Sequence, residues 1–97
     1  MYGLIGRMLA KPGRREELLA AMTDSSQAMP GCISYVVARD GENPDALWIT
    51  EVWDDAAAHK ASLQLDSVKA AIATAMPLIA GFDSRSVTEP VSVFLKR

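Results

Sequence analysis

A carboxylate, an indole and the single histidine of the chain lie close together in the sequence, at Glu51, Trp53 and His59. In an extended strand Glu51 and Trp53 would share one face, because successive side chains point to opposite faces. A carboxylate can orient or deprotonate a substrate, and an indole offers a flat wall for an aromatic ring. Imidazole is the side chain whose ordinary pKa lies near neutrality. We therefore assign His59 and Glu51 to a candidate catalytic site and Trp53 to its substrate wall.

Each of these residues also has a purely structural interpretation. Trp53 could fill the core, and Glu51 could pair with a basic side chain such as Arg39 or Arg85. A lone histidine on a helix is more often solvated or packed than catalytic. Tyr35 shares one face of a second predicted strand with Arg39, and we assign both to the substrate site, although packing is the alternative role for Tyr35.

The composition describes one globular domain, residues 1–97, with 49% hydrophobic and 23% charged residues. A net charge of −2 gives no electrostatic reason to expect nucleic acid or an anionic membrane as a partner. The single cysteine, Cys32, cannot form an internal disulfide, and no metal-ligand motif occurs, so we expect no metal site. The chain lacks a long apolar stretch and a signal-peptide pattern, and we expect a soluble, cytoplasmic protein.

The elements that must position these residues follow from hydrophobic periods and from breaks at proline and glycine. Extended structure is expected at residues 4–9, 32–39, 47–53 and 82–95. Helices are expected from residue 14 to the break at 29–31, from 55 to 63 or 65, and from 66, with its N-cap at Asp66-Ser67, to about 77. The order β-α-β-β-α-β is typical of the ferredoxin-like α+β plan, an antiparallel four-stranded sheet with helices on one face.

Apolar residues occur on both faces of the predicted strands, for example at Leu4 and Ile5 and at Trp48 and Trp53. Two helices can cover only one face of the sheet, so the other face must meet a second chain or a ligand. We predict a homodimer that pairs sheet to sheet, with residues 91–95 in the interface and an apolar cavity beside the sheet.

Four of the five methionines, at positions 8, 22, 29 and 76, are expected in the core. Methionine is unbranched and polarisable, so it adapts to irregular packing. These side chains would also suit a pocket for a flat ligand.

Short motifs recur in a defined order along almost the whole chain. They are K-P-G at 11–13, P-G-C at 30–32, E-V-W-D-D-A-A at 51–57 and P-L-I-A-G at 77–81. In this order and spacing the chain resembles the antibiotic biosynthesis monooxygenase family. The resemblance implies a dimeric α+β barrel built from ferredoxin-like halves. The characterised members of that family include haem-degrading enzymes and cofactor-independent monooxygenases that act on quinols and polycyclic aromatic anthrones.

The resemblance implies an oxidoreductase without a cofactor, acting on a small aromatic or quinol substrate and O2. A deprotonated hydroquinone can itself reduce O2, so the protein need supply only an apolar cavity, a proton acceptor and orientation. The alternative function is a non-catalytic dimer of the same fold that binds or senses a small molecule.

The chain departs from the family at three places. Members commonly carry a histidine nine residues after the tryptophan and a second one after that helix, and these positions are Ser62 and Ser67 here. His59 lies one helical turn before the first of them. The strand at residues 2–10 also lacks the asparagine that the haem-degrading members use beside the haem, which argues against haem degradation.

Overall fold

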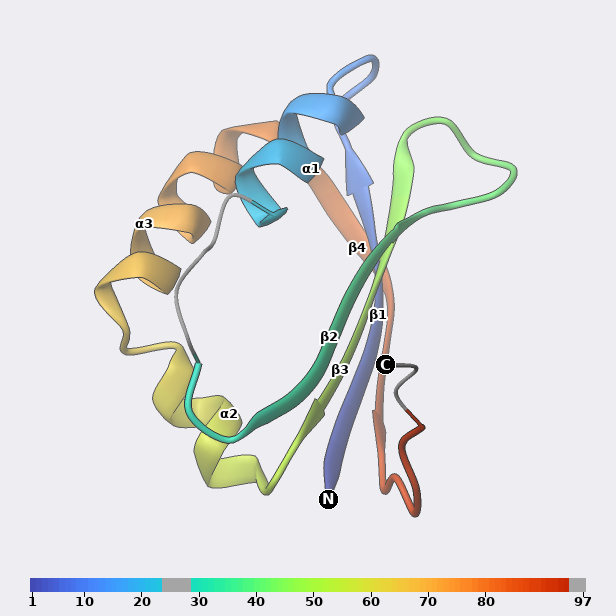
Figure 1. The fold of residues 1–97 in the computed structure, drawn as a ribbon. Helices are drawn as coiled ribbons and strands as arrows, with labels where there is room; N and C mark the ends of the chain where they lie inside the picture. The colour runs from blue at the N-terminus through green and yellow to red at the C-terminus, as the bar shows by residue number, and fades with distance from the viewer. Residues whose placement is uncertain (24–28, 95–97) are drawn as a thin grey trace.

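The computed structural model of the chain describes residues 1–23 and 29–94, whose arrangement is shown in Figure 1. The strands are β1 (Tyr2–Ala10), β2 (Cys32–Arg39), β3 (Ala46–Trp53) and β4 (Ile79–Thr88). They form one antiparallel sheet in the order β2-β3-β1-β4. The helices are α1 (Arg15–Thr23), α2 (Ala56–Ser62) and α3 (Asp66–Ala75), followed by the 3-10 turn η1 (Met76–Leu78). All of them lie on one side of the sheet, which confirms the predicted ferredoxin-like α+β fold (Figure 1).

The core lies between this helical layer and the sheet. Its fully buried large side chains are Leu18 of α1 and Leu47 and Trp53 of β3. Because β3 is an inner strand of the sheet, its inward-facing side chains are covered by the helices. None of the helices in the described part of the chain is long and apolar enough to cross a membrane.

Several element boundaries differ from those expected; β1, for example, begins at Tyr2 instead of residue 4. Strand β4 begins at Ile79, three residues early, because Ile79 already pairs with Ala10 of β1. Residues 89–94 lie outside the sheet, since Pro90 cannot donate to a ladder, and the last residue of the expected extended segment, at position 95, falls outside the described residues. The predicted N-cap of α3 is wrong: Leu65 holds that position and makes no side-chain bond. The predicted part of the first helix at 24–28 also falls outside the described residues.

The face of the sheet away from the helices mixes apolar and charged side chains. Arg7 of β1 lies between two carboxylates, with Nε 3.2 Å from Asp40 Oδ2 and Nη1 2.7 Å from Asp83 Oδ2. The Trp48 indole N–H donates to the same Asp40 carboxylate at 2.8 Å. The apolar character expected of this face is therefore interrupted by a polar network around Arg7.

Candidate active site

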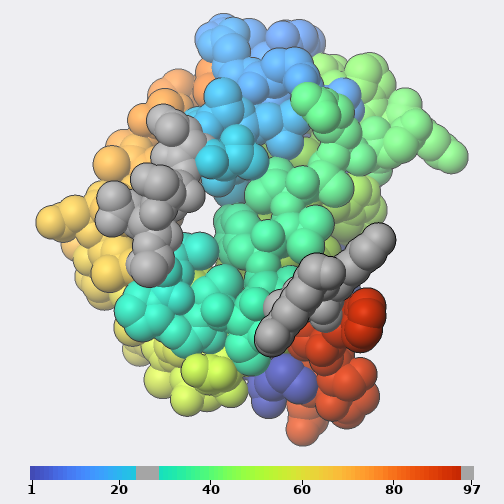
Figure 2. Space-filling view, viewed as in Figure 1, coloured from blue at the N-terminus to red at the C-terminus, as the bar shows by residue number. Residues whose placement is uncertain are grey.

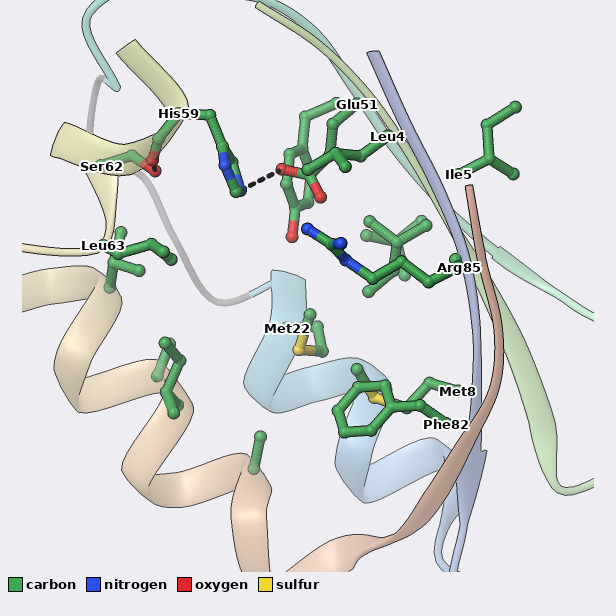
Figure 3. A pocket seen from close by; sticks show the side chains of 18 of the residues that line it. Leu4, Ile5, Met8, Met22, Glu51, His59, Ser62, Leu63, Phe82 and Arg85 are labelled. Atoms are coloured by element: carbon green, nitrogen blue, oxygen red, sulfur yellow. Dashed lines mark hydrogen bonds and ion pairs between the residues drawn. The ribbon is translucent and has the colours of Figure 1, made fainter. Parts of the chain in front are cut away.

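A cavity of about 640 Å3 lies between the sheet and the helices, and residues of all four strands and of the helical layer line it (Figure 3). Ligand pockets for small molecules commonly have a volume of this order. Most of the lining is apolar, and Met8, Met22, Met29 and Met76 all contribute, as expected of a pocket for a flat ligand. The core position expected for all four is confirmed for Met8 alone, since Met22 and Met29 are partly exposed and Met76 is 56% exposed. In the space-filling view the surface is open between α1 and β2 (Figure 2). The cavity can therefore hold a flat, largely apolar ligand.

Glu51, Trp53 and His59 meet at one end of this cavity. The Trp53 indole N–H donates to Glu51 Oε1 at 3.1 Å, and His59 Nε2 lies 3.8 Å from the same oxygen (Figure 3). The indole and imidazole rings pack edge to face, with centroids 5.5 Å apart. The structure thus brings together the three residues that their spacing in the sequence had suggested. Trp53 is both a core residue, 1% exposed, and part of the cavity wall.

The position of His59 follows from the way α2 begins and packs. The Asp55 side chain caps α2 by accepting the Ala58 N–H at 2.7 Å. Gly31, at the entry to β2, has a φ of +81°, and a Cβ there would lie 2.6 Å from the Ala58 Cβ. Only glycine suits this positive φ and this close approach, so the turn before β2 packs directly on α2. The Ser62 hydroxyl donates to the His59 carbonyl at 2.6 Å within the same helix.

A second aromatic ring flanks the imidazole. Tyr2, at the start of β1, lies with its ring centroid 5.8 Å from that of His59. Tyr2 is paired with Trp53 across the sheet, so both rings reach His59 from neighbouring strands. No pattern in the sequence singled out Tyr2, because its contact with His59 depends on the pairing of β1 with β3.

Tyr35 lines the same cavity and is the cross-strand partner of Glu51. Burial, and then the nearby Glu51 carboxylate, raise the pKa of Tyr35 to about 12. The phenol therefore keeps its proton at neutral pH and can donate a hydrogen bond, but it is unsuited to be a base. The pKa of the Cys32 thiol is also raised by burial, so the structure offers no thiolate here.

Arg39 does not line the cavity. Its guanidinium binds the Glu16 carboxylate of α1, with Nε–Oε2 and Nη2–Oε1 distances of 3.1 and 2.5 Å. Arg39 lies opposite Leu47 at the end of the sheet that α1 covers, so its side chain meets that helix. The structure therefore places Arg39 outside the candidate site, contrary to the substrate role expected from the sequence.

Arg85 of β4 is a cavity residue that the sequence did not single out as a site residue. Its guanidinium extends from the sheet into the cavity, on the side of Glu51 (Figure 3). The pairing of β1 with β4 shifts register between Arg7 and Met8 and again between Leu9 and Ala10. Such irregularities break the two-residue alternation, so the sequence alone did not show which β4 side chains face the helices.

Polar groups that could hold a metal ion are sparse. Within residues 1–23 and 29–94, no three His, Cys, Asp or Glu side chains lie close enough together to do so. The site instead combines the imidazole of His59, the carboxylate of Glu51, the phenol of Tyr35 and the guanidinium of Arg85 within apolar walls. This set can accept a proton, donate a hydrogen bond and bind a planar ligand.

Solved structures with the same fold are found in several bacteria. A protein from Chloroflexus aurantiacus J-10-fl, provisionally named as an antibiotic biosynthesis monooxygenase, is 55% identical to this chain, with a TM-score of 0.92. The match covers 96% of this chain and 95% of that one. Provisionally named proteins from Deinococcus radiodurans (24% identity, TM-score 0.75, 100% and 99% covered) and Nitrosomonas europaea (15%, 0.80, 95% and 100%) share the fold.

The family model gives the same result over most of the chain. Residues 1–74 match the model described as Antibiotic biosynthesis monooxygenase, a span that holds the candidate site apart from its residues in β4, in η1 and at the end of α3. No curated protein matches the chain. The matched span and the 55% identity together show that this chain belongs to the antibiotic biosynthesis monooxygenase family.

Proposed function

We propose that the protein is a monooxygenase that oxidises a quinol or a related electron-rich aromatic with O2 and without a bound cofactor. The observation that carries this proposal is the His59–Glu51–Trp53 cluster at the end of an apolar cavity. Membership of the family supports the reaction class. The cavity volume of about 640 Å3 supports a substrate of one to a few fused rings.

The proposed reaction converts a hydroquinone and O2 into a hydroxyquinone and water. Deprotonation makes the ring electron-rich enough to pass an electron to O2, and recombination forms a bond between a ring carbon and oxygen. The resulting hydroperoxide loses water: the proton on that carbon leaves, the O–O bond breaks, and one oxygen atom stays on the ring. Four electrons leave the substrate in total and reduce the O2 molecule, so no external reductant is required.

Three polar residues of the site, His59, Glu51 and Tyr35, have roles in this scheme. His59 accepts the phenolic proton, and Glu51, 3.8 Å away, stabilises the imidazolium that forms. Tyr35 donates a hydrogen bond to a substrate oxygen, because its raised pKa keeps it protonated. Trp53 forms the flat wall, and the apolar lining limits the access of water to reactive intermediates.

A binding or sensing function without chemistry is the second candidate. Ser62 and Ser67 both line the cavity at the positions where resembling members carry histidines. The Ser62 hydroxyl is engaged with the His59 carbonyl, so it does not replace an imidazole. His59 itself decides between the two functions, because it is the one imidazole that reaches the cavity.

Oxygen uptake with a panel of hydroquinones tests the proposal, using a variant with a filled cavity as the control. Gly6 lies on the cavity wall, and the nearest atom to a Cβ built there is Ser84 O at 3.7 Å. Gly6→Leu should therefore fold while its side chain occupies the substrate space. We expect uptake above the rate of spontaneous oxidation in the native protein and its loss in Gly6→Leu. Equal rates in the two proteins would favour the binding function.

The proposed assembly is a homodimer. The exposed apolar side chains Val36, on the face of the sheet away from the helices, and Val91 and Phe94, beyond β4, support it, since burying them in a second copy would be favourable. Light scattering after gel filtration at micromolar concentration should give about twice the chain mass of 10.5 kDa. Deletion of residues 90–97 should shift the mass toward one chain, because it removes part of the expected interface. A stable monomer of the intact chain would contradict the assembly.

A further inference from the structure

We infer that Arg85 binds an oxyanion carried by the aromatic ligand of the cavity, either a carboxylate on its ring or a phenolate. The inference rests on the proposed function for the aromatic character of the ligand. It adds a charged group to the substrate and assigns the residue that recognises it.

The position of Arg85 in the sheet directs its side chain over an open stretch of the cavity wall. Arg85 of β4 is the cross-strand partner of Gly6 of β1, which has no side chain. The next residue across the sheet is Ile49 of β3, which pairs with Gly6 on its other side. Gly6 thus leaves a gap between Arg85 and Ile49. The Arg85 guanidinium extends into the cavity, on the side of Glu51 (Figure 3).

The charge of Arg85 lacks the pairing that the other described arginines have. Those other arginines each lie within ion-pair distance of a carboxylate: Arg7 with Asp40 and Asp83, Arg14 with Glu17, Arg15 with Glu16, and Arg39 with Glu16. Within residues 1–23 and 29–94, no carboxylate lies within 4.0 Å of a nitrogen of Arg85. Glu51, the carboxylate that lines the cavity, already accepts from Trp53 and faces His59.

An unpaired guanidinium beside apolar walls is a binding site for an oxygen anion. Its planar fork of N–H donors matches a carboxylate in a bidentate arrangement and also accepts a phenolate. Arg85 is exposed in the single chain, as expected for a side chain that projects into open space rather than into packed core. A ligand anion would supply the counter-charge that the described residues do not.

This arrangement fixes how a substrate would lie. With its oxyanion on Arg85, a flat ring would cover Gly6 and extend toward Tyr35 and the His59–Glu51 pair. The anion could be a carboxylate on the ring or a phenolate formed in the cavity. In both cases the chemistry recognised is the same, an oxygen anion attached to an aromatic ring.

Two naphthalene probes of nearly the same shape, one charged and one neutral, test whether the anion is a carboxylate on the ring. We expect calorimetric titration to show that Arg85→Gln weakens binding of 2-naphthoate by about 10- to 100-fold, the usual weight of a hydrogen bond to a charged group. Binding of the neutral 2-naphthamide should change by less than about twofold. Arg39→Gln is the matched control, since Arg39 lies outside the cavity, and it should alter neither probe. Equal weakening of both probes by Arg85→Gln would indicate a role in packing and would exclude a ring carboxylate as the anion that Arg85 binds.

A titratable probe tests whether the anion is a phenolate formed in the cavity. The apparent pKa of bound 2-naphthol, followed by its absorbance, should be lower in the native protein than in Arg85→Gln if the site stabilises a phenolate. The inference holds if Arg85→Gln affects 2-naphthoate selectively or shifts this pKa, and the responding probe identifies the source of the anion. It is overturned if neither probe depends on Arg85, or if the native protein binds none of the probes at millimolar concentration. If oxygen uptake with a neutral hydroquinone is unchanged in Arg85→Gln, the proposed function holds without a role for Arg85.

Discussion

Replacing His59 with alanine should lower the turnover of a hydroquinone by about two to four powers of ten, the usual contribution of one general base. His59 is the imidazole of the cavity, and its Nε2 lies near a carboxylate that can stabilise the protonated ring. Initial rates of oxygen uptake at saturating substrate measure the effect. Hydroquinones ionise more as the pH rises, so rates of native and variant protein must be compared at one pH.

Glu51→Gln separates the two candidate bases. If His59 accepts the proton, the loss in Glu51→Gln should be smaller than in His59→Ala, and the double variant should lose little more than His59→Ala alone. The reverse order would make Glu51 the base. Lys60→Ala is the control, because Lys60 is the exposed neighbour of His59 on α2 and does not line the cavity. Rates of His59→Ala and Glu51→Gln within about twofold of native would contradict a catalytic role for the pair.

Trp53→Ala should lower the free energy of unfolding by about 3–5 kcal/mol, the usual cost of deleting a large buried aromatic side chain. Trp53 is 1% exposed and the largest of the fully buried side chains, so its removal leaves a void beside α2. Urea denaturation of the two proteins measures the difference. A loss below about 1 kcal/mol would mean that the surrounding side chains collapse into the space and that Trp53 does not support the wall.

Trp53→Phe tests the contribution of Trp53 to binding. The smaller ring keeps an apolar wall but deletes the N–H that holds Glu51 Oε1 at 3.1 Å. We expect KM to rise more than kcat falls, because the wall binds the ring of the substrate throughout the reaction. Trp48→Phe is the matched control: it removes an indole N–H bonded to Asp40 on the other face of the sheet. An equal rise of KM in both variants would show that the effect does not come from the cavity.

The elements around Glu51 and Trp53 could be predicted because β3 is regular. It pairs with β1 without a register shift, so the two-residue alternation places both side chains on one face. The start of α2 was equally clear, because an aspartate before three alanines is a strong N-cap signal and Asp55 does cap the helix. Local chemistry therefore determined the strand face, the helix start and hence the approach of His59.

The role of the arginines could not be predicted in the same way. The face on which Arg85 lies depends on the register shifts between β1 and β4, which are properties of strand pairing. Arg39 shares a face with Tyr35, as predicted, but α1 covers that end of the sheet and offers Glu16 as a partner. Alternation predicts the face of a side chain, whereas the partner it meets there depends on how the helices pack.

Oxidation with isotopically labelled O2 tests the proposed chemistry most directly. In a monooxygenase reaction each O2 consumed leaves one labelled atom on the ring and one in water, and His59→Ala should suppress both together. A quinone product without label, accompanied by one hydrogen peroxide for each O2 consumed, is the result of simple two-electron oxidation. Finding that product at the same rate with native protein and with His59→Ala would contradict a monooxygenase function for this cavity.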